Sequence, residues 1–97
     1  MTTQERIDRG AEAQRLIQNP VYQQAKDKIL QQIAYLRQDV PPRDTEGAMR
    51  LIQMEQTVIK TWMHLEAFVQ DGDMAAKELE KAVTPLHRRV ARKFRAA

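Results

Sequence analysis

The chain has 97 residues with 3 Gly, 4 Pro, no Cys and a formal net charge of +3, which is enough for one small domain (1–97) and excludes a disulfide framework or a thiolate metal site. Gln, Ala, Arg, Leu, Glu and Lys fill most of the sequence, and no β-branched run alternates with polar residues, so the composition favours helices. Because no leader-like or membrane-spanning apolar segment is present, we expect a protein that is neither secreted nor transmembrane.

Charge is distributed unevenly along the chain. Residues 81–97 hold six basic residues and no acidic one, whereas the first 80 residues hold ten basic and thirteen acidic residues, a net charge of −3. The sequence therefore combines a slightly acidic body with a basic tail, residues 84–97.

Two helices are predicted before the middle of the chain. Thr2 and Glu5 have the spacing of a capping box and start the first helix. Asn19-Pro20 ends it, because the residue before proline is pushed out of the α region and proline suits the first position of the next helix. This second helix runs from about Pro20 to Asp39, and its apolar residues recur at steps of three and four: Tyr22, Ala25, Ile29, Ile33, Leu36 and Val40.

The segment from Asp44 to Gln70 is predicted to be the longest helix, about 40 Å long at 1.5 Å per residue. Pro41-Pro42 separates it from the second helix, and Asp44 is its N-cap. Its core-facing stripe is formed by Ala48, Leu51, Val58, Trp62, Leu65 and Val69, interrupted by Glu55 and widened by Ile52, Ile59 and Met63.

Two shorter helices are predicted near the C-terminus. Asp71-Gly72-Asp73 is typical of a helix end followed by a new start, with Gly72 in the left-handed conformation. A short helix would follow from Met74 to Val83, and Thr84-Pro85 would begin a last helix from Leu86 to Arg95.

The predicted fold class is all-α. The second helix and the long helix, joined by a short turn, would form an antiparallel helical hairpin, with the shorter N- and C-terminal helices across its ends. Because two long helices bury only one seam, we expect the outer apolar residues to pack against further copies in an oligomeric bundle. The expected oligomer or partner interface consists of Leu51, Ile52, Glu55, Val58, Ile59, Trp62 and Met63.

The sequence lacks the residue patterns of an active site or cofactor site. It has no Gly-rich phosphate loop, no GxSxG and no HExxH, and His64 and His87 are too far apart to suggest a metal site. We therefore expect no catalytic residues, no metal and no cofactor. Glu55, on the apolar side of the long helix, is expected to pair with a cation across an oligomer seam. Trp62 is expected to lie in the core, although it could also line a ligand groove with neighbouring methionines.

The basic tail is the strongest local signal. Its expected contacts with an anionic partner come from Arg88, Arg89, Arg92, Lys93 and Arg95. This cluster favours docking on an acidic protein surface, while salt-sensitive binding to nucleic acid and binding to an anionic membrane surface remain alternatives.

Residues 13–30 and 44–80 resemble small all-helical proteins that tailed bacteriophages encode among their virion-morphogenesis genes. The shared features are a helix break, a helix start, a His-Leu-Glu element and a closing turn: Asn19-Pro20, Asp44-Thr45-Glu46, His64-Leu65-Glu66 and Asp71-Gly72. The resemblance covers about half of the chain and does not include the basic tail.

The resemblance and the residue patterns together suggest a non-enzymatic, oligomeric helical interaction protein, a structural or accessory component of bacteriophage virion assembly. Its partners would be other copies of itself and other virion proteins, and its location the host cytoplasm or the virion. One alternative is a small phage-encoded inhibitor of host defence that binds a host protein or an anionic nucleotide. A second is a nucleic-acid-binding accessory protein that acts through the basic tail.

Overall fold

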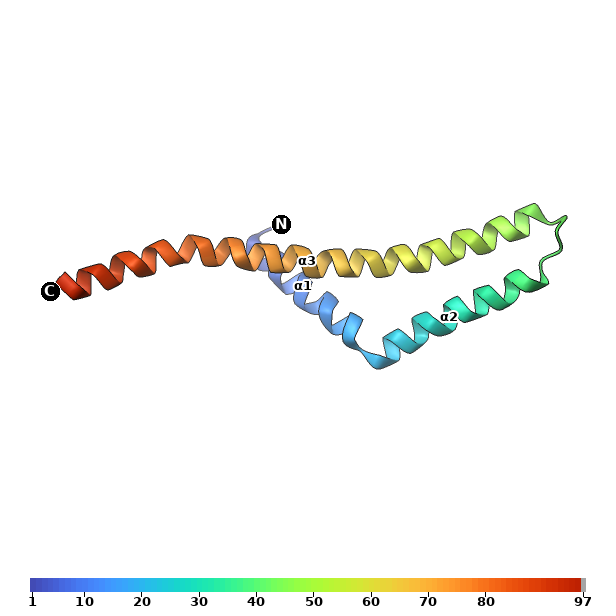
Figure 1. Ribbon diagram of the computed structural model, residues 1–97, viewed down its shortest axis with the longest axis horizontal. Helices are drawn as coiled ribbons and strands as arrows, with labels where there is room; N and C mark the ends of the chain where they lie inside the picture. Colours follow the sequence, from blue (N-terminus) through green and yellow to red (C-terminus); the bar gives the residue numbers. More distant parts are fainter. Residues whose placement is uncertain (97) are drawn as a thin grey trace.

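A computed structural model describes the backbone of residues 1–96 and the side chains of residues 1–83. It contains α1 (Thr3–Gln18), α2 (Pro20–Asp39) and α3 (Thr45–Ala96), and no strand among the described residues. The all-α class predicted from the sequence is confirmed (Figure 1).

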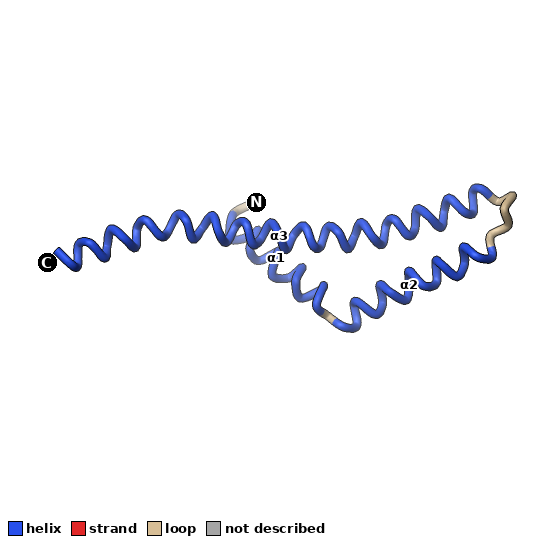
Figure 2. The backbone as a smooth tube through the Cα atoms, in the orientation of Figure 1, coloured by secondary structure: helices blue, strands red, loops and turns tan. Residues whose placement is uncertain are grey.

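Each helix begins where the sequence predicts, because a side-chain oxygen just before it accepts hydrogen bonds from free N–H groups of the first turn. Thr2 accepts from the N–H of Glu5 (3.1 Å), Asn19 from those of Val21 (2.9 Å) and Tyr22 (3.1 Å), and Asp44 from that of Gly47 (2.8 Å). Figure 2 shows the short non-helical segments at these junctions.

The predicted helix end at Asp71-Gly72-Asp73 is wrong, and so is the predicted restart at Thr84-Pro85. The 52 residues of α3 form one continuous helix that includes both segments, so the two separate C-terminal helices do not exist. No glycine among the described residues has a positive φ, and Gly72 is therefore not a left-handed helix cap.

Gly72 instead allows α1 to cross α3 at backbone contact. A Cβ atom on Gly72 would lie 3.0 Å from the Cα of Gly10, and one on Gly10 would lie 2.9 Å from the Cα of Gly72. Ala13 and Ala75 flank the crossing and are 3% and 0% exposed. Four small residues thus bring the two backbones together, which explains a glycine inside a long helix.

Ion pairs at the edge of the crossing account for Asp71. Its carboxylate lies 2.8 Å from a guanidinium nitrogen of Arg6 and 3.1 Å from one of Arg9, and Arg6 also reaches Glu78 at 3.2 Å. Hydrogen bonds from Arg6 hold the pKa of Asp71 below its ordinary value, Arg9 adds to this effect, and partial desolvation opposes it. The guanidinium of Arg9 also lies 4.2 Å from the ring centroid of Phe68.

The molecule is elongated. Its principal extents are 82 × 24 × 16 Å and its radius of gyration is 22.6 Å, whereas a compact chain of this length has a radius of about 12–13 Å. In Figure 1, α1 crosses the middle of α3, α2 returns toward the start of α3, and the C-terminal part of α3 projects beyond the other two helices. α1 packs against α3 more extensively than α2 does, and in Figure 1 the α2 and α3 ribbons diverge toward the start of α2.

Very little of the described chain is buried. Ala13, Ile33 and Ala75 are its only buried hydrophobic residues, and none of them is large and fully enclosed. A single copy therefore has no core of ordinary size.

Candidate interaction surface

The seven interface residues predicted from the sequence divide between two sides of α3. Leu51, Val58 and Trp62 are half-buried and line hollows between α2 and α3. Ile59 and Met63 lie outside these hollows, with 42% and 58% of their surface exposed. The structure therefore uses part of the predicted interface within the chain and leaves the remainder open.

Trp62 of α3 contacts α2 through two side chains. Its ring stacks on Tyr22 with centroids 5.8 Å apart and planes 20° apart, and the Nζ atom of Lys26 lies 3.8 Å from the Trp62 ring centroid. Both contacts are of stabilising types. A hollow of about 210 Å³ beside the stack is lined by Tyr22, Lys26, Ile29, Thr57, Val58, Thr61 and Trp62.

Glu55 pairs with a cation, but within its own chain. Its carboxylate lies 2.7 Å from a guanidinium nitrogen of Arg37 on α2, rather than across the oligomer seam expected from the sequence. Because 34% of the Glu55 side chain and 46% of the Arg37 side chain are exposed, this pair contributes at most about 1 kcal/mol and mainly orients the two helices.

A second apolar stripe runs along the open side of α3. We call it the outer stripe and define it as Met49, Ile52, Ile59, Met63 and Met74. Their spacings of 3, 7, 4 and 11 residues are close to whole turns, so they share one helix face. All but the half-buried Ile52 are exposed, Met63 and Met74 by 58% each.

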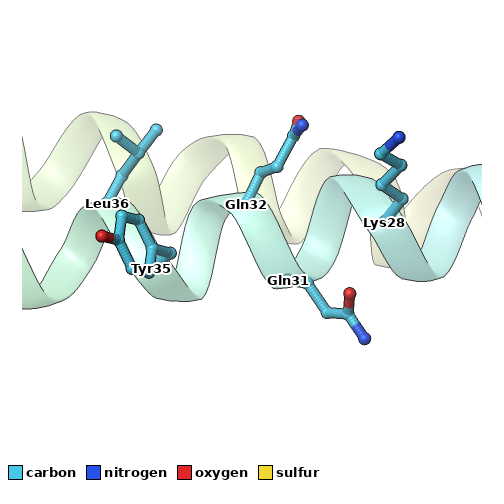
Figure 3. A pocket seen from close by; sticks show the side chains of 5 residues that line it. All are labelled: Lys28, Gln31, Gln32, Tyr35 and Leu36. Atoms are coloured by element: carbon cyan, nitrogen blue, oxygen red, sulfur yellow. The ribbon is translucent and has the colours of Figure 1, made fainter.

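Exposed apolar side chains are also present on α2, where Leu36 lies at the edge of the hollow shared with α3. Figure 3 shows Lys28, Gln32 and Leu36 projecting to the same side of α2, with Tyr35 next to Leu36. Tyr35 is 68% exposed and Leu36 48%. Tyr22 of the same helix is half-buried against Trp62, whereas Tyr35 stays available for contact.

The basic tail continues α3 beyond α1. Its backbone is helical as far as Ala96, so it is an extension of the long helix and not a separate one. The predicted contact residues Arg88, Arg89, Arg92, Lys93 and Arg95 have side chains outside the described part of the chain.

Among the described residues, no group of three or more His, Asp or Glu side chains is arranged to hold a metal ion. Within the same part of the chain, no helical stretch combines the length and the apolar character needed to cross a membrane.

The α1–α3 crossing was missed from the sequence. Its signal is a pair of small residues three apart on each helix, Gly10 with Ala13 and Gly72 with Ala75. That spacing on two helices is typical of close helix contact. A single glycine, however, is equally compatible with a destabilised helix or with a helix end.

Comparison of the chain with family models, with curated proteins and with solved structures finds no match.

Proposed function

We propose that this chain is a non-enzymatic helical interaction protein that self-associates through the outer stripe and the exposed face of α2. In this proposal a closed helical bundle forms only in the assembly, where further copies complete the core that the splayed α2 and α3 leave open. The protein then acts as a structural element, and its function consists of the protein–protein contacts that its surface makes.

The observation that carries the proposal is the imbalance between buried and exposed apolar side chains. Within residues 1–83, three hydrophobic residues are buried while thirteen large hydrophobic residues are exposed. Burying one large apolar side chain contributes roughly 1.5–3 kcal/mol, so association of the exposed ones is strongly favoured. Apolar surface of this extent on an elongated chain is typical of protein–protein contact.

Light scattering combined with size-exclusion chromatography tests the proposal. We expect a mass that is a multiple of the 11.3 kDa chain. Ile59→Glu combined with Met63→Glu should weaken association roughly 100-fold or more, because two buried apolar side chains are lost and two charges meet apolar surface. Ala11→Glu, at an exposed position of α1 that belongs to neither surface, is the control and should leave the mass unchanged. A wild-type chain that stays monomeric at millimolar concentration contradicts the proposal.

The resemblance of residues 13–30 and 44–80 to small bacteriophage morphogenesis proteins supports a role in virion assembly as part of this proposal. The chain would be a structural or accessory component that contacts other virion proteins. Co-purification with intact particles is the expected result, and recovery only from the particle-free fraction of an infected lysate would contradict it.

Nucleic-acid binding by the basic tail is a second candidate, supported by the way α3 carries the tail away from the body of the molecule (Figure 1). Arg88→Ala, Arg89→Ala and Arg92→Ala together should then abolish retardation of duplex DNA at low salt. Retardation that the triple variant leaves unchanged would eliminate this candidate.

A further inference from the structure

We propose that two copies of this chain pair with their α3 helices antiparallel, so that the basic end of each α3 lies beside the acidic part of the other. This inference rests on the proposed self-association and adds the orientation of the partner. The occupant of the exposed face of α3 is therefore a second copy of the same chain.

The first argument is the charge division within a single helix. Between Thr45 and Glu80, α3 carries seven acidic and three basic residues, a net charge of −4, whereas residues 81–96 carry six basic residues and no acidic one. Because α3 is continuous, these two segments keep a fixed order and separation along one axis. A charge pattern of this kind selects the direction of a pairing helix.

The second argument is that acidic side chains border the outer stripe without an ion-pair partner. Glu66 lies about one turn after Met63, and Asp73 is next to Met74. Both acids are exposed, and neither forms an ion pair among the described residues. Asp71, by contrast, is engaged by Arg6 and its contact is already made. The open apolar face thus has unneutralised acids at its edge, which a basic helix would neutralise.

The third argument concerns the projecting end of α3. The contacts of α1 with α3 reach Glu78 through Arg6, and beyond this point Leu79 and Val83 are 45% and 37% exposed. This end of α3 therefore has exposed apolar side chains next to a run of positive charge. The acidic part of a second copy complements that positive charge.

A parallel in-register pair would place the two segments 81–96, each with six basic residues, side by side, and like charges would repel along these 16 residues. The acidic residues of α3 are concentrated in 61–80, which holds five acidic residues and one basic one. An antiparallel pair in which residues 81–96 of each chain lie beside this segment of the other brings both basic segments next to acidic ones and closes with two-fold symmetry. A staggered parallel arrangement also brings a tail beside an acidic segment, but it leaves one tail unpaired and grows into a filament.

Energy transfer between labelled chains distinguishes these arrangements, since the chain has no native cysteine. Gln53→Cys and Ala82→Cys introduce labelling sites at exposed, uncharged positions of α3, which are about 44 Å apart along the helix. The labelled chains should assemble as the wild type does. Mixing chains that carry a donor at residue 53 with chains that carry an acceptor at residue 82 should then give severalfold more energy transfer than mixing chains that carry donor and acceptor both at residue 53.

Equal or greater transfer in the matched 53–53 sample overturns the antiparallel orientation, while the mass still supports self-association. A mass that grows continuously with concentration favours the staggered filament and also overturns the closed pair. A monomeric mass overturns the proposed function and this inference together.

Charge reversal gives a second, independent readout. Arg88→Glu, Arg89→Glu and Arg92→Glu in one variant, and Glu66→Lys with Asp73→Lys in another, should each weaken self-association about tenfold or more. Mixing the two variants should restore association, and circular dichroism should show that each remains helical. Arg15→Glu, at an exposed position of α1 outside both surfaces, is the control and should change association little. Absence of rescue in the mixture would overturn the inference.

Discussion

At the residue scale, two glycines determine how α1 meets α3. A side chain at either position would enter the backbone of the other helix, because the nearest atoms to the added Cβ belong to the main chain and not to a flexible side chain. Alanine has a more favourable helix propensity than glycine by about 1 kcal/mol, so helix propensity alone would favour alanine at both positions. The close crossing is the reason that they are present.

Gly10→Ala should therefore destabilise the chain although it favours the helix. Its Cβ would lie 2.9 Å from both the Cα of Gly72 and the carbonyl oxygen of Phe68, so the helices must separate, at a cost of about 1–3 kcal/mol. Urea unfolding at a fixed chain concentration measures the change. Gln14→Ala, at an exposed position of α1, is the control and should alter stability by less than about 0.5 kcal/mol. A stabilised Gly10→Ala variant would contradict the crossing.

The pKa of Asp71 predicts how the α1–α3 contact responds to acid. Arg6 lowers the pKa of Asp71 below its ordinary value of 3.8, so the folded chain releases this proton more readily than the unfolded chain does. The resulting stabilisation is complete above the ordinary value and is lost as the pH falls through the lowered pKa.

Asp71→Asn should remove this acid-sensitive contribution. The difference in stability between wild type and variant should be constant near neutral pH and shrink below about pH 4. Thermal unfolding followed at several pH values measures it. Asp39→Asn, which alters an exposed carboxylate outside any described ion pair, should have no comparable effect. A difference that grows on acidification would contradict the assigned pairing.

At the scale of the elements, the helix starts follow from local chemistry. Asn19 accepts hydrogen bonds from the N–H groups of two residues in α2, and Pro20 occupies the first position of the helix. These contacts involve residues within three positions of each other, so the sequence is sufficient to predict them. The continuation of α3 through residues 71–73 could not be predicted in this way, because it depends on contacts with α1, more than 60 residues away in the sequence.

Asn19→Ala should destabilise α2 by about 1 kcal/mol, since the N–H groups of Val21 and Tyr22 lose their acceptor. Thermal melting followed by circular dichroism at 222 nm, a wavelength sensitive to helix, is the measurement. Asn19→Asp keeps the accepting oxygen and should retain most of the stability. Equal stability of the Ala variant and wild type would show that the cap contributes nothing.

At the scale of the whole molecule, shape and burial lead to the same conclusion. A chain that extends 82 Å with three buried hydrophobic residues among those described lacks the core that usually stabilises a domain of this size. Folding and association should therefore be linked.

We expect the melting temperature to rise with chain concentration, because the assembled state is favoured by mass action. For a two-chain assembly, each tenfold increase in concentration should stabilise the complex by about 1.4 kcal/mol. Differential scanning calorimetry over two decades of concentration measures this dependence. The Ile59→Glu and Met63→Glu double variant should lose it, and a wild-type melting temperature independent of concentration would contradict the linkage.

The amino-acid sequence by itself determined the all-α class, the starts of the three helices and the exposed position of the outer apolar residues Ile59 and Met63. These features depend on hydrophobic periodicity and on caps formed within one turn. Only the tertiary structure decided that α3 continues through Asp71-Gly72-Asp73, that Glu55 pairs with Arg37, and that Trp62 stacks on Tyr22. Each of these depends on a residue from another helix, and no local pattern specifies which distant backbone or side chain will lie beside a given position.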